Sequence, residues 1–169
     1  MIHVCPLSKI EETVSGTGAE RLITLINAGT PVVRPASILA EHHLRLSMND
    51  IAEAQEGMTL PGQEHVAALL DFARNWSRAR PLVVHCYAGI SRSTASAYIM
   101  AAALSPKRDE FELAAALRRA SPTATPNVRL IALADALMDR RGRMVEAIRG
   151  IGRGAEAFEG APFELALES

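Results

Sequence analysis

Short apolar runs recur along this chain and are separated by longer stretches with an amphipathic pattern. The runs at residues 2–5, 22–26 and 82–85 are rich in β-branched side chains and predict strands. Residues 43–48 predict a fourth strand, because apolar side chains alternate there with polar ones. Apolar runs with little alternation are typical of strands that are covered on both faces, as in parallel sheets. The pattern therefore predicts a sheet buried between other elements.

Helices are predicted between these strands and after the last of them. They cover residues 8–14, 61–76, 92–104, 109–120 and 126–138. From Gly142 onward, glycines interrupt the pattern, and apolar side chains alternate with other residues over 163–168. A docked terminal strand and a frayed end are both open interpretations of this last region.

Three of the helix starts have recognisable signals. Ser8 and Glu11 have the spacing of a capping box. Asp109 is a residue type that caps helices through its side chain. Thr125 followed by Pro126 predicts the start of the last helix, because proline suits the first helical turn.

Strands and helices that alternate in this way predict an α/β fold. We expect a single domain with a central, mainly parallel sheet of four or five strands and helices on both sides. The 169 residues are enough for one well-cored domain and too few for two. Residues 1–150 are expected to form this domain and residues 151–169 a C-terminal tail, for which docking as a strand is one interpretation.

Composition excludes several classes of protein. The formal net charge of -1 argues against general attraction to nucleic acids or membranes. No apolar stretch approaches the ~20 residues that span a bilayer, and no basic segment followed by an apolar run opens the chain. We therefore expect a cytoplasmic protein. Two cysteines do not make a disulfide framework.

The segment from Pro81 to Thr94 places a cysteine between a buried strand and a buried helix. Cys86 follows the strand, Arg92 begins the helix, and a short loop containing Gly89 joins them. The N–H groups of such a loop and the positive end of the helix dipole converge, which is how proteins hold a phosphate-sized dianion. The same groups favour the thiolate, which is the nucleophilic form of cysteine. The segment predicts a nucleophile that faces a bound phosphoryl group.

Neighbouring side chains fit this chemistry. The planar guanidinium of Arg92 can bond two phosphoryl oxygens at once. Gly89 permits a close ligand approach or a backbone angle that a Cβ would forbid. The hydroxyls of Ser91, Ser93 and Thr94 can cap the helix or bond the sulfur. The alternative, a core cysteine beside a capping arginine, is disfavoured because an arginine at a helix start opposes the dipole unless an anion is bound.

The run from His85 to Ser93, HCYAGISRS, resembles the H-C-x-x-G-x-x-R-S signature of the cysteine-based protein tyrosine phosphatase superfamily. The chain length is similar to that of its compact dual-specificity branch, of bacterial type. This resemblance implies metal-independent phosphomonoester hydrolysis through a cysteinyl-phosphate, with no cofactor. The substrate would be a phosphorylated protein or a small phosphate ester, and a phosphate or sulfate would fit the loop.

The resemblance also implies roles for individual residues. Cys86 is the nucleophile, Ser93 bonds the departing sulfur, and His85 and Thr94 support the loop. Asn27 is similar to an asparagine that braces the loop in dual-specificity phosphatases, although on sequence alone it could be an ordinary turn residue. The phosphate-binding residues would be Tyr87, Ala88, Gly89, Ile90, Ser91 and Arg92.

A phosphate ester also needs a proton donor for its leaving oxygen. In the resembling family the donor is an aspartate on a loop that follows a strand and precedes the helix leading to the cysteine strand, and Asp50 fits this placement. The competing acids are Glu53, Glu56, Glu64 and Asp71.

Three other classes of function remain open. A phosphoprotein-binding pseudophosphatase would keep the cradle and lose the nucleophile or the acid. A rhodanese-like or arsenate-reductase-like enzyme would use the loop cysteine, in the second case with a resolving thiol for which Cys5 is the candidate. A phosphatase for non-protein phosphate esters is the third class. The loop has no lysine to meet additional phosphates, which favours a singly phosphorylated site.

Overall fold

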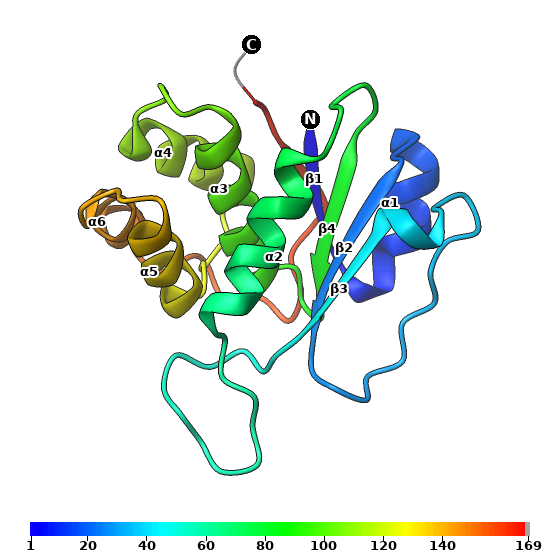
Figure 1. Cartoon of the computed structure of the whole chain (residues 1–169), viewed down its shortest axis with the longest axis horizontal. Helices are drawn as coiled ribbons and strands as arrows, with labels where there is room; N and C mark the ends of the chain where they lie inside the picture. The colour runs from blue at the N-terminus through cyan, green and yellow to red at the C-terminus, as the bar shows by residue number, and fades with distance from the viewer. Residues whose placement is uncertain (168–169) are drawn as a thin grey trace.

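A five-stranded sheet runs through the middle of the protein, seen here in a computed structural model that describes residues 1–167 (Figure 1). The strands are β1 (Ile2–Pro6), β2 (Arg21–Ile26), β3 (His43–Ser47), β4 (Leu82–Cys86) and β5 (Phe163–Leu165). Their order across the sheet is β3-β2-β4-β1-β5. The strands β1 to β4 run parallel to one another, and β5 is antiparallel to β1. The mainly parallel α/β fold is confirmed.

Helices cover both faces of this sheet unequally (Figure 1). The helix α1 (Ile10–Thr17) packs alone on one face, against β1 and β4. The other face carries α2 (Gln63–Arg74), α3 (Arg92–Leu104), α4 (Glu110–Ala120), α5 (Val128–Leu137) and α6 (Arg143–Ile151). Among these, α3 lies directly on β1 and β4, where its many alanines allow close contact. Short 3₁₀ turns, η1 (Leu7–Lys9) and η2 (Ala40–His42), precede α1 and β3.

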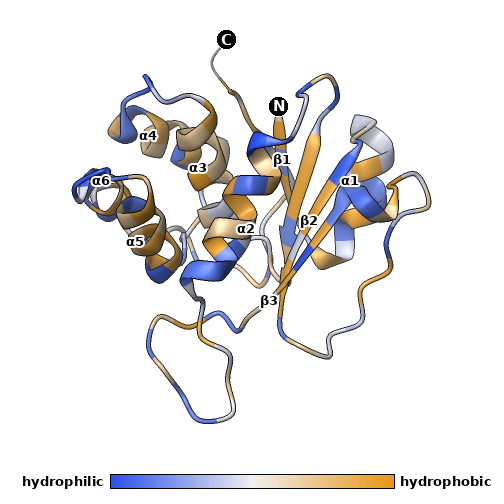
Figure 2. Cartoon of the chain, in the orientation of Figure 1, coloured by the Kyte–Doolittle hydropathy of each residue, from blue (hydrophilic) through white to orange (hydrophobic). Residues whose placement is uncertain are grey.

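Most strand residues are hydrophobic (Figure 2). Because their side chains alternate between the two faces of the sheet, they divide the core in two. Val4 and Val84 belong to the large core under α2–α6, whereas Cys5 and Val83 belong to the small core under α1. Successive side chains of a strand point to opposite faces. The same alternation places Cys86 on the α3 side of the sheet and the preceding His85 on the α1 side.

The expected capping box at the start of the first helix is wrong. Residues 7–9 form η1, and α1 begins at Ile10 without a side-chain cap. The Ser8 hydroxyl instead donates to the Glu159 carboxylate at 2.9 Å. A segment distant in the sequence therefore supplies a partner that competes with the local cap.

The sequence pattern did not predict α6, because the glycines around it were interpreted as breakers. Gly142 and Gly152 flank the helix at its two cap positions and have φ angles of 84° and 64°, which glycine adopts without strain. The carboxylate of Asp135, on α5, accepts hydrogen bonds from the N–H groups of Gly142 (2.7 Å) and Met144 (2.8 Å). The helix is thus capped by its neighbour rather than by its own sequence.

The chain after α6 crosses back toward the sheet. Residues 152–162 have no helix or strand, and residues 163–165 then form β5 beside β1. Residues 168 and 169 of the predicted tail lie outside the described residues. No helix within residues 1–167 is long and apolar enough to cross a membrane.

Candidate active site

The loop from β4 to α3 has the conformation that its sequence indicates. Cys86 is the last residue of β4 and Arg92 the first of α3. Gly89 has a φ angle of 69°, and a Cβ there would lie 2.8 Å from the main-chain nitrogen of Pro6. Both the left-handed backbone and the close approach to β1 therefore require glycine at this position.

The carbonyl groups of this loop are held from outside. Main-chain N–H groups donate from Leu7 to Tyr87 O (3.1 Å), Gly160 to Ala88 O (2.7 Å), Thr125 to Ile90 O (2.9 Å) and Asn127 to Ser91 O (3.2 Å). Within residues 1–167, the N–H groups of residues 87–91 donate to no protein acceptor. Fixing the carbonyls outward leaves a set of main-chain donors for an anion, an arrangement found in phosphate-binding loops.

Arg92 is pinned at the carboxyl ends of the neighbouring strands. Its side chain is buried, and Nη1 donates to Asn27 Oδ1 at 2.7 Å and to the Met48 carbonyl at 2.8 Å. Nε is also buried, and it has no hydrogen-bond partner among the described residues. Since a guanidinium carries five N–H donors, donors remain for the oxygens of an anion. Asn27, to which the resemblance gave a bracing role, thus contacts the Arg92 guanidinium directly.

The Cys86 sulfur lies close to the first turn of α3. Sγ is 3.1 Å from the Ser93 hydroxyl, and both residues are buried. A hydroxyl at this distance can donate to a thiolate. The next residue, Thr94, turns its hydroxyl back to the Ser91 carbonyl at 3.0 Å, which closes the loop onto the helix.

His85 connects the loop to the opposite face of the sheet. Its Nδ1 lies 3.2 Å from the Cys86 carbonyl, and its Nε2 lies 2.7 Å from the Thr24 hydroxyl, which is 2.8 Å from His43 Nε2. Because a carbonyl only accepts, Nδ1 must carry the proton, and Nε2 then accepts from Thr24. Burial lowers the pKa of His85 to about 4, so the ring is neutral at neutral pH. Sequence reasoning did not find Thr24, which the strand register places opposite His85.

Acidification is expected to destabilise the protein through His85. The unfolded histidine has a pKa near 6.5 and the folded one a pKa of about 4. Between these values the unfolded state binds more protons, so the free energy of unfolding decreases as the pH falls through this window, by about 2 kcal/mol between pH 7.5 and pH 5. Urea unfolding at about pH 7.5 and about pH 5 measures the change.

A His85→Gln variant removes this titration, and its stability should depend less on pH over the same window. His42→Gln is the matched control, because His42 is only partly buried and has no described contact with the loop. An equal pH dependence in wild type and His85→Gln contradicts the assignment.

Asp50 lies at the rim of the loop. Its Oδ1 accepts hydrogen bonds from the Ser91 hydroxyl at 2.7 Å and from Asn127 Nδ2 at 2.9 Å. The side chain is exposed, so a ligand can reach its second oxygen. Asp50 is hydrogen-bonded to the loop. Within the described residues, the loop has no hydrogen bond to the other acids weighed from the sequence, which are Glu53, Glu56, Glu64 and Asp71.

Asn127 was not predicted as a site residue. The expected helix start at Thr125–Pro126 is displaced: α5 begins at Val128, and the Asn127 side chain accepts from the N–H groups of Arg129 and Leu130. The same amide donates to Asp50 and so connects the helix to the candidate acid. An asparagine before an apolar periodic stretch is a capping signal that could have been recognised. The bond to Asp50 has no sequence signal, because 77 positions separate the two residues.

Cys5 is the second free cysteine and lies in the small core. Burial raises the pKa of its thiol to about 12, so it stays protonated. The register pairs Cys5 with His85 rather than with Cys86, and the two thiols therefore belong to opposite faces of the sheet. Residues 1–167 contain no cluster of three or more histidine, cysteine or acidic side chains suited to a metal ion.

Comparison with solved structures finds the same architecture in known phosphatases. The crystal structure of DUSP15 superimposes with a TM-score of 0.64, over 92% of this chain and 94% of that chain, at 18% identity. The PTP-2 phosphatase of Cydia pomonella gives 0.62 over 80% and 84%, at 15% identity. This chain has the dual-specificity phosphatase fold. Human DUSP28 gives 0.58 over 82% and 94%, at 19% identity.

Comparisons at the level of sequence give no match for this chain. No protein-family model matches the chain, and no curated protein is significantly similar to it. In this dual-specificity phosphatase fold, the site lies beyond the carboxyl ends of β2, β3 and β4, where open parallel sheets place their ligands.

Proposed function

We propose that this protein is a metal-independent phosphomonoester hydrolase that acts on phosphorylated proteins, as a tyrosine or dual-specificity phosphatase. The observation that supports it best is the loop of residues 87–91: four of its five carbonyl groups accept hydrogen bonds from residues outside the loop, while its N–H groups have no protein acceptor among the described residues. Cys86 and Arg92 border this cradle from opposite ends. The phosphatase fold is consistent with the proposal.

In the first step, the Cys86 thiolate attacks phosphorus in line with the leaving oxygen. The S–P bond forms as the P–O bond to the leaving group breaks, and Asp50 gives its proton to that oxygen. The hydrogen bonds from Ser91 and Asn127 both end on Oδ1 of Asp50, so they orient the carboxyl group while Oδ2 carries the proton.

In the second step, water attacks the cysteinyl-phosphate. Asp50, now a carboxylate, takes a proton from this water as the O–P bond forms. The S–P bond breaks and the sulfur leaves as a thiolate, which accepts a hydrogen bond from Ser93 at the 3.1 Å separation seen here. Inorganic phosphate is the product, and the enzyme returns to its starting state.

The charge on the transferring group is stabilised throughout by fixed donors. The loop N–H groups and the unused donors of Arg92 surround the three equatorial oxygens, and the positive end of the α3 dipole points at the same place. Because the strand ends and the outer hydrogen bonds hold these donors in position, little reorganisation is needed as charge moves. His85 and Thr94 support the loop from beneath.

Replacing Asp50 with asparagine is expected to separate two kinds of substrate. An alkyl leaving group such as that of phosphoserine needs the proton, and its turnover should fall by about 100-fold to 1,000-fold. The aryl group of para-nitrophenyl phosphate leaves well without a proton and should lose only about 10-fold. Initial rates of phosphate release, in the absence of metal, measure both.

Glu53→Gln is the matched control, because Glu53 belongs to the same loop and has no described contact with the cradle. It should keep wild-type rates on both substrates. Equal losses on aryl and alkyl substrates in Asp50→Asn would assign the acid role elsewhere. Failure of the wild type to release phosphate from phosphotyrosine, phosphoserine and phosphothreonine peptides would overturn the proposed function.

A further inference from the structure

A cavity of about 980 Å³ adjoins the loop on the side of Asp50. It is lined by the start of α5, the end of α6 and residues 152–158, and we call it the side groove. Ile131 and Ile148, both buried, are among the apolar residues that line it. Val128 and Phe158 also line it, with exposed fractions of 61% and 86%. Large apolar side chains gathered beside a polar site are typical of binding surfaces.

The side groove and the cradle share residues. Asp50, Ile90 and Ser91 line the side groove, and all three also belong to the candidate active site. In the proposed reaction Asp50 protonates the leaving oxygen, so the leaving group is next to Asp50. The rest of the leaving group therefore has a continuous path from the cradle into the side groove.

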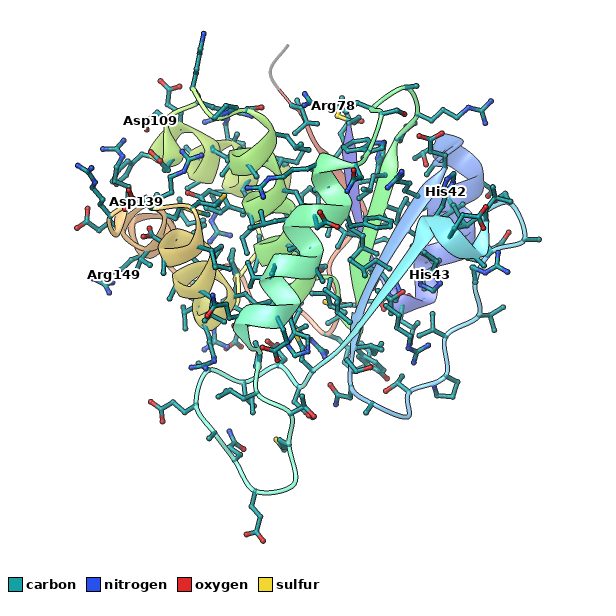
Figure 3. All side chains as sticks on the ribbon, viewed as in Figure 1. His42, His43, Arg78, Asp109, Asp139 and Arg149 are labelled. Atoms are coloured by element: carbon teal, nitrogen blue, oxygen red, sulfur yellow. The ribbon has the colours of Figure 1, made fainter. Side chains whose placement is uncertain are left out.

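The far wall of the side groove carries positive charge. Arg149 is exposed at the end of α6 (Figure 3), and its side chain has no partner among the described residues. Arg153 follows, 3.6 Å from Glu156 and largely exposed. A cation without a partner at the rim of an apolar groove favours an acidic group on the ligand. The charge is local, because the chain as a whole has a net charge of -1.

The segment of residues 156–158 distinguishes between two kinds of ligand. It lines the side groove without regular secondary structure, and its main-chain groups have no hydrogen-bond partner within residues 1–167. An extended peptide can use such groups through its own backbone, whereas an acyl chain cannot. The absence of a net positive charge on the protein also disfavours an anionic lipid surface.

We propose that the side groove binds the part of a phosphopeptide that flanks the phosphorylated residue. A large apolar side chain of the peptide packs among Val128, Ile148 and Phe158, and an acidic side chain lies near Arg149. This inference rests on the proposed function for the location of the phosphoryl group. It adds a sequence preference that the cradle alone does not provide.

The test measures peptide binding rather than turnover, so that it does not depend on catalysis. Phosphotyrosine peptides carry one leucine and one glutamate, moved one position at a time on either side of the phosphotyrosine. A peptide with glycine and serine at these positions is the reference. Fluorescence anisotropy on a Cys86→Ser background should give one arrangement that binds at least about 10-fold more tightly than the reference.

Variants of the side groove should remove this preference. Ala157→Trp places an indole in the side groove from an exposed position, and should bring the ratio of the two Kd values close to one. Arg149→Glu should remove only the part of the binding preference that comes from the glutamate of the peptide, and should keep the part that comes from the leucine. Phe111→Ser and Arg119→Glu are the matched controls, because both residues are exposed on α4 outside the side groove, and they should keep the wild-type ratio.

Two outcomes overturn the inference: no arrangement is preferred, or the preference survives in Ala157→Trp with its fold intact by thermal unfolding. A third outcome assigns the side groove to a lipid: Ala157→Trp weakens binding of a long-chain alkyl phosphate in micelles and leaves peptide binding unchanged. Hydrolysis of para-nitrophenyl phosphate by the wild type is measured separately. If it fails while the peptide preference depends on the side groove, the proposed function is wrong and the binding site stands.

Discussion

Replacing Cys86 with serine is expected to lower kcat by about 10⁴-fold or more on every phosphate ester. A serine hydroxyl is not ionised at neutral pH, and a good nucleophile needs either ionisation or an adjacent base. The neighbour of the Cys86 sulfur is the Ser93 hydroxyl, 3.1 Å away, which is not a base. Rapid quenching of the wild type with labelled substrate should trap a phosphoryl group on the protein, and the variant should trap none.

Cys5→Ser is the matched control for this variant. Cys5 is also buried, but its pKa is raised to about 12 and its side chain lies in the small core. Its replacement should lower stability modestly and leave turnover close to the wild-type rate. The nucleophile assignment would be contradicted if Cys86→Ser turned over substrate within about 100-fold of the wild-type rate. It would also be contradicted if a phosphoryl group were trapped on the Cys86→Ser protein.

Replacing Arg92 with lysine is expected to lower kcat/KM by about 10³-fold, although the charge is kept. A lysine ammonium cannot hold the Asn27 and Met48 oxygens and bond two phosphoryl oxygens in one plane at the same time. The loss should therefore appear on aryl and alkyl substrates alike, unlike the loss in Asp50→Asn. Steady-state kinetics on both substrates measure it.

Two comparisons make the Arg92 prediction specific. Asn27→Ala removes one of the two protein contacts of the guanidinium and leaves the charge in place, so its loss should be smaller, about 10-fold. Arg119→Lys, on the exposed face of α4, should have no effect. A loss below about 10-fold in Arg92→Lys would show that the guanidinium geometry does not act on the transferring phosphoryl group.

The contiguous features of this protein could be predicted from its sequence. The apolar runs identified β1, β2 and β4 because a strand covered on both faces needs apolar side chains at nearly every position. Alternation of apolar and polar side chains identified β3. Asp109 caps α4 as predicted, because a cap involves only N–H groups two or three residues away. The loop from Cys86 to Arg92 was equally accessible, since a strand, a turn and a helix start lie within a few residues of one another.

What only the tertiary structure decided is which distant groups meet. The register of β2 against β4 places Thr24 beside His85, and the path of the chain after α6 brings Gly160 to the Ala88 carbonyl. Asn127 reaches Asp50 only once α5 has packed against α2 and α3. Local propensities act over a few residues, whereas these contacts depend on strand register and on the packing of whole elements. The sequence by itself therefore determined most of the elements and the loop from Cys86 to Arg92, and folding decided what holds that loop and what lies beside it.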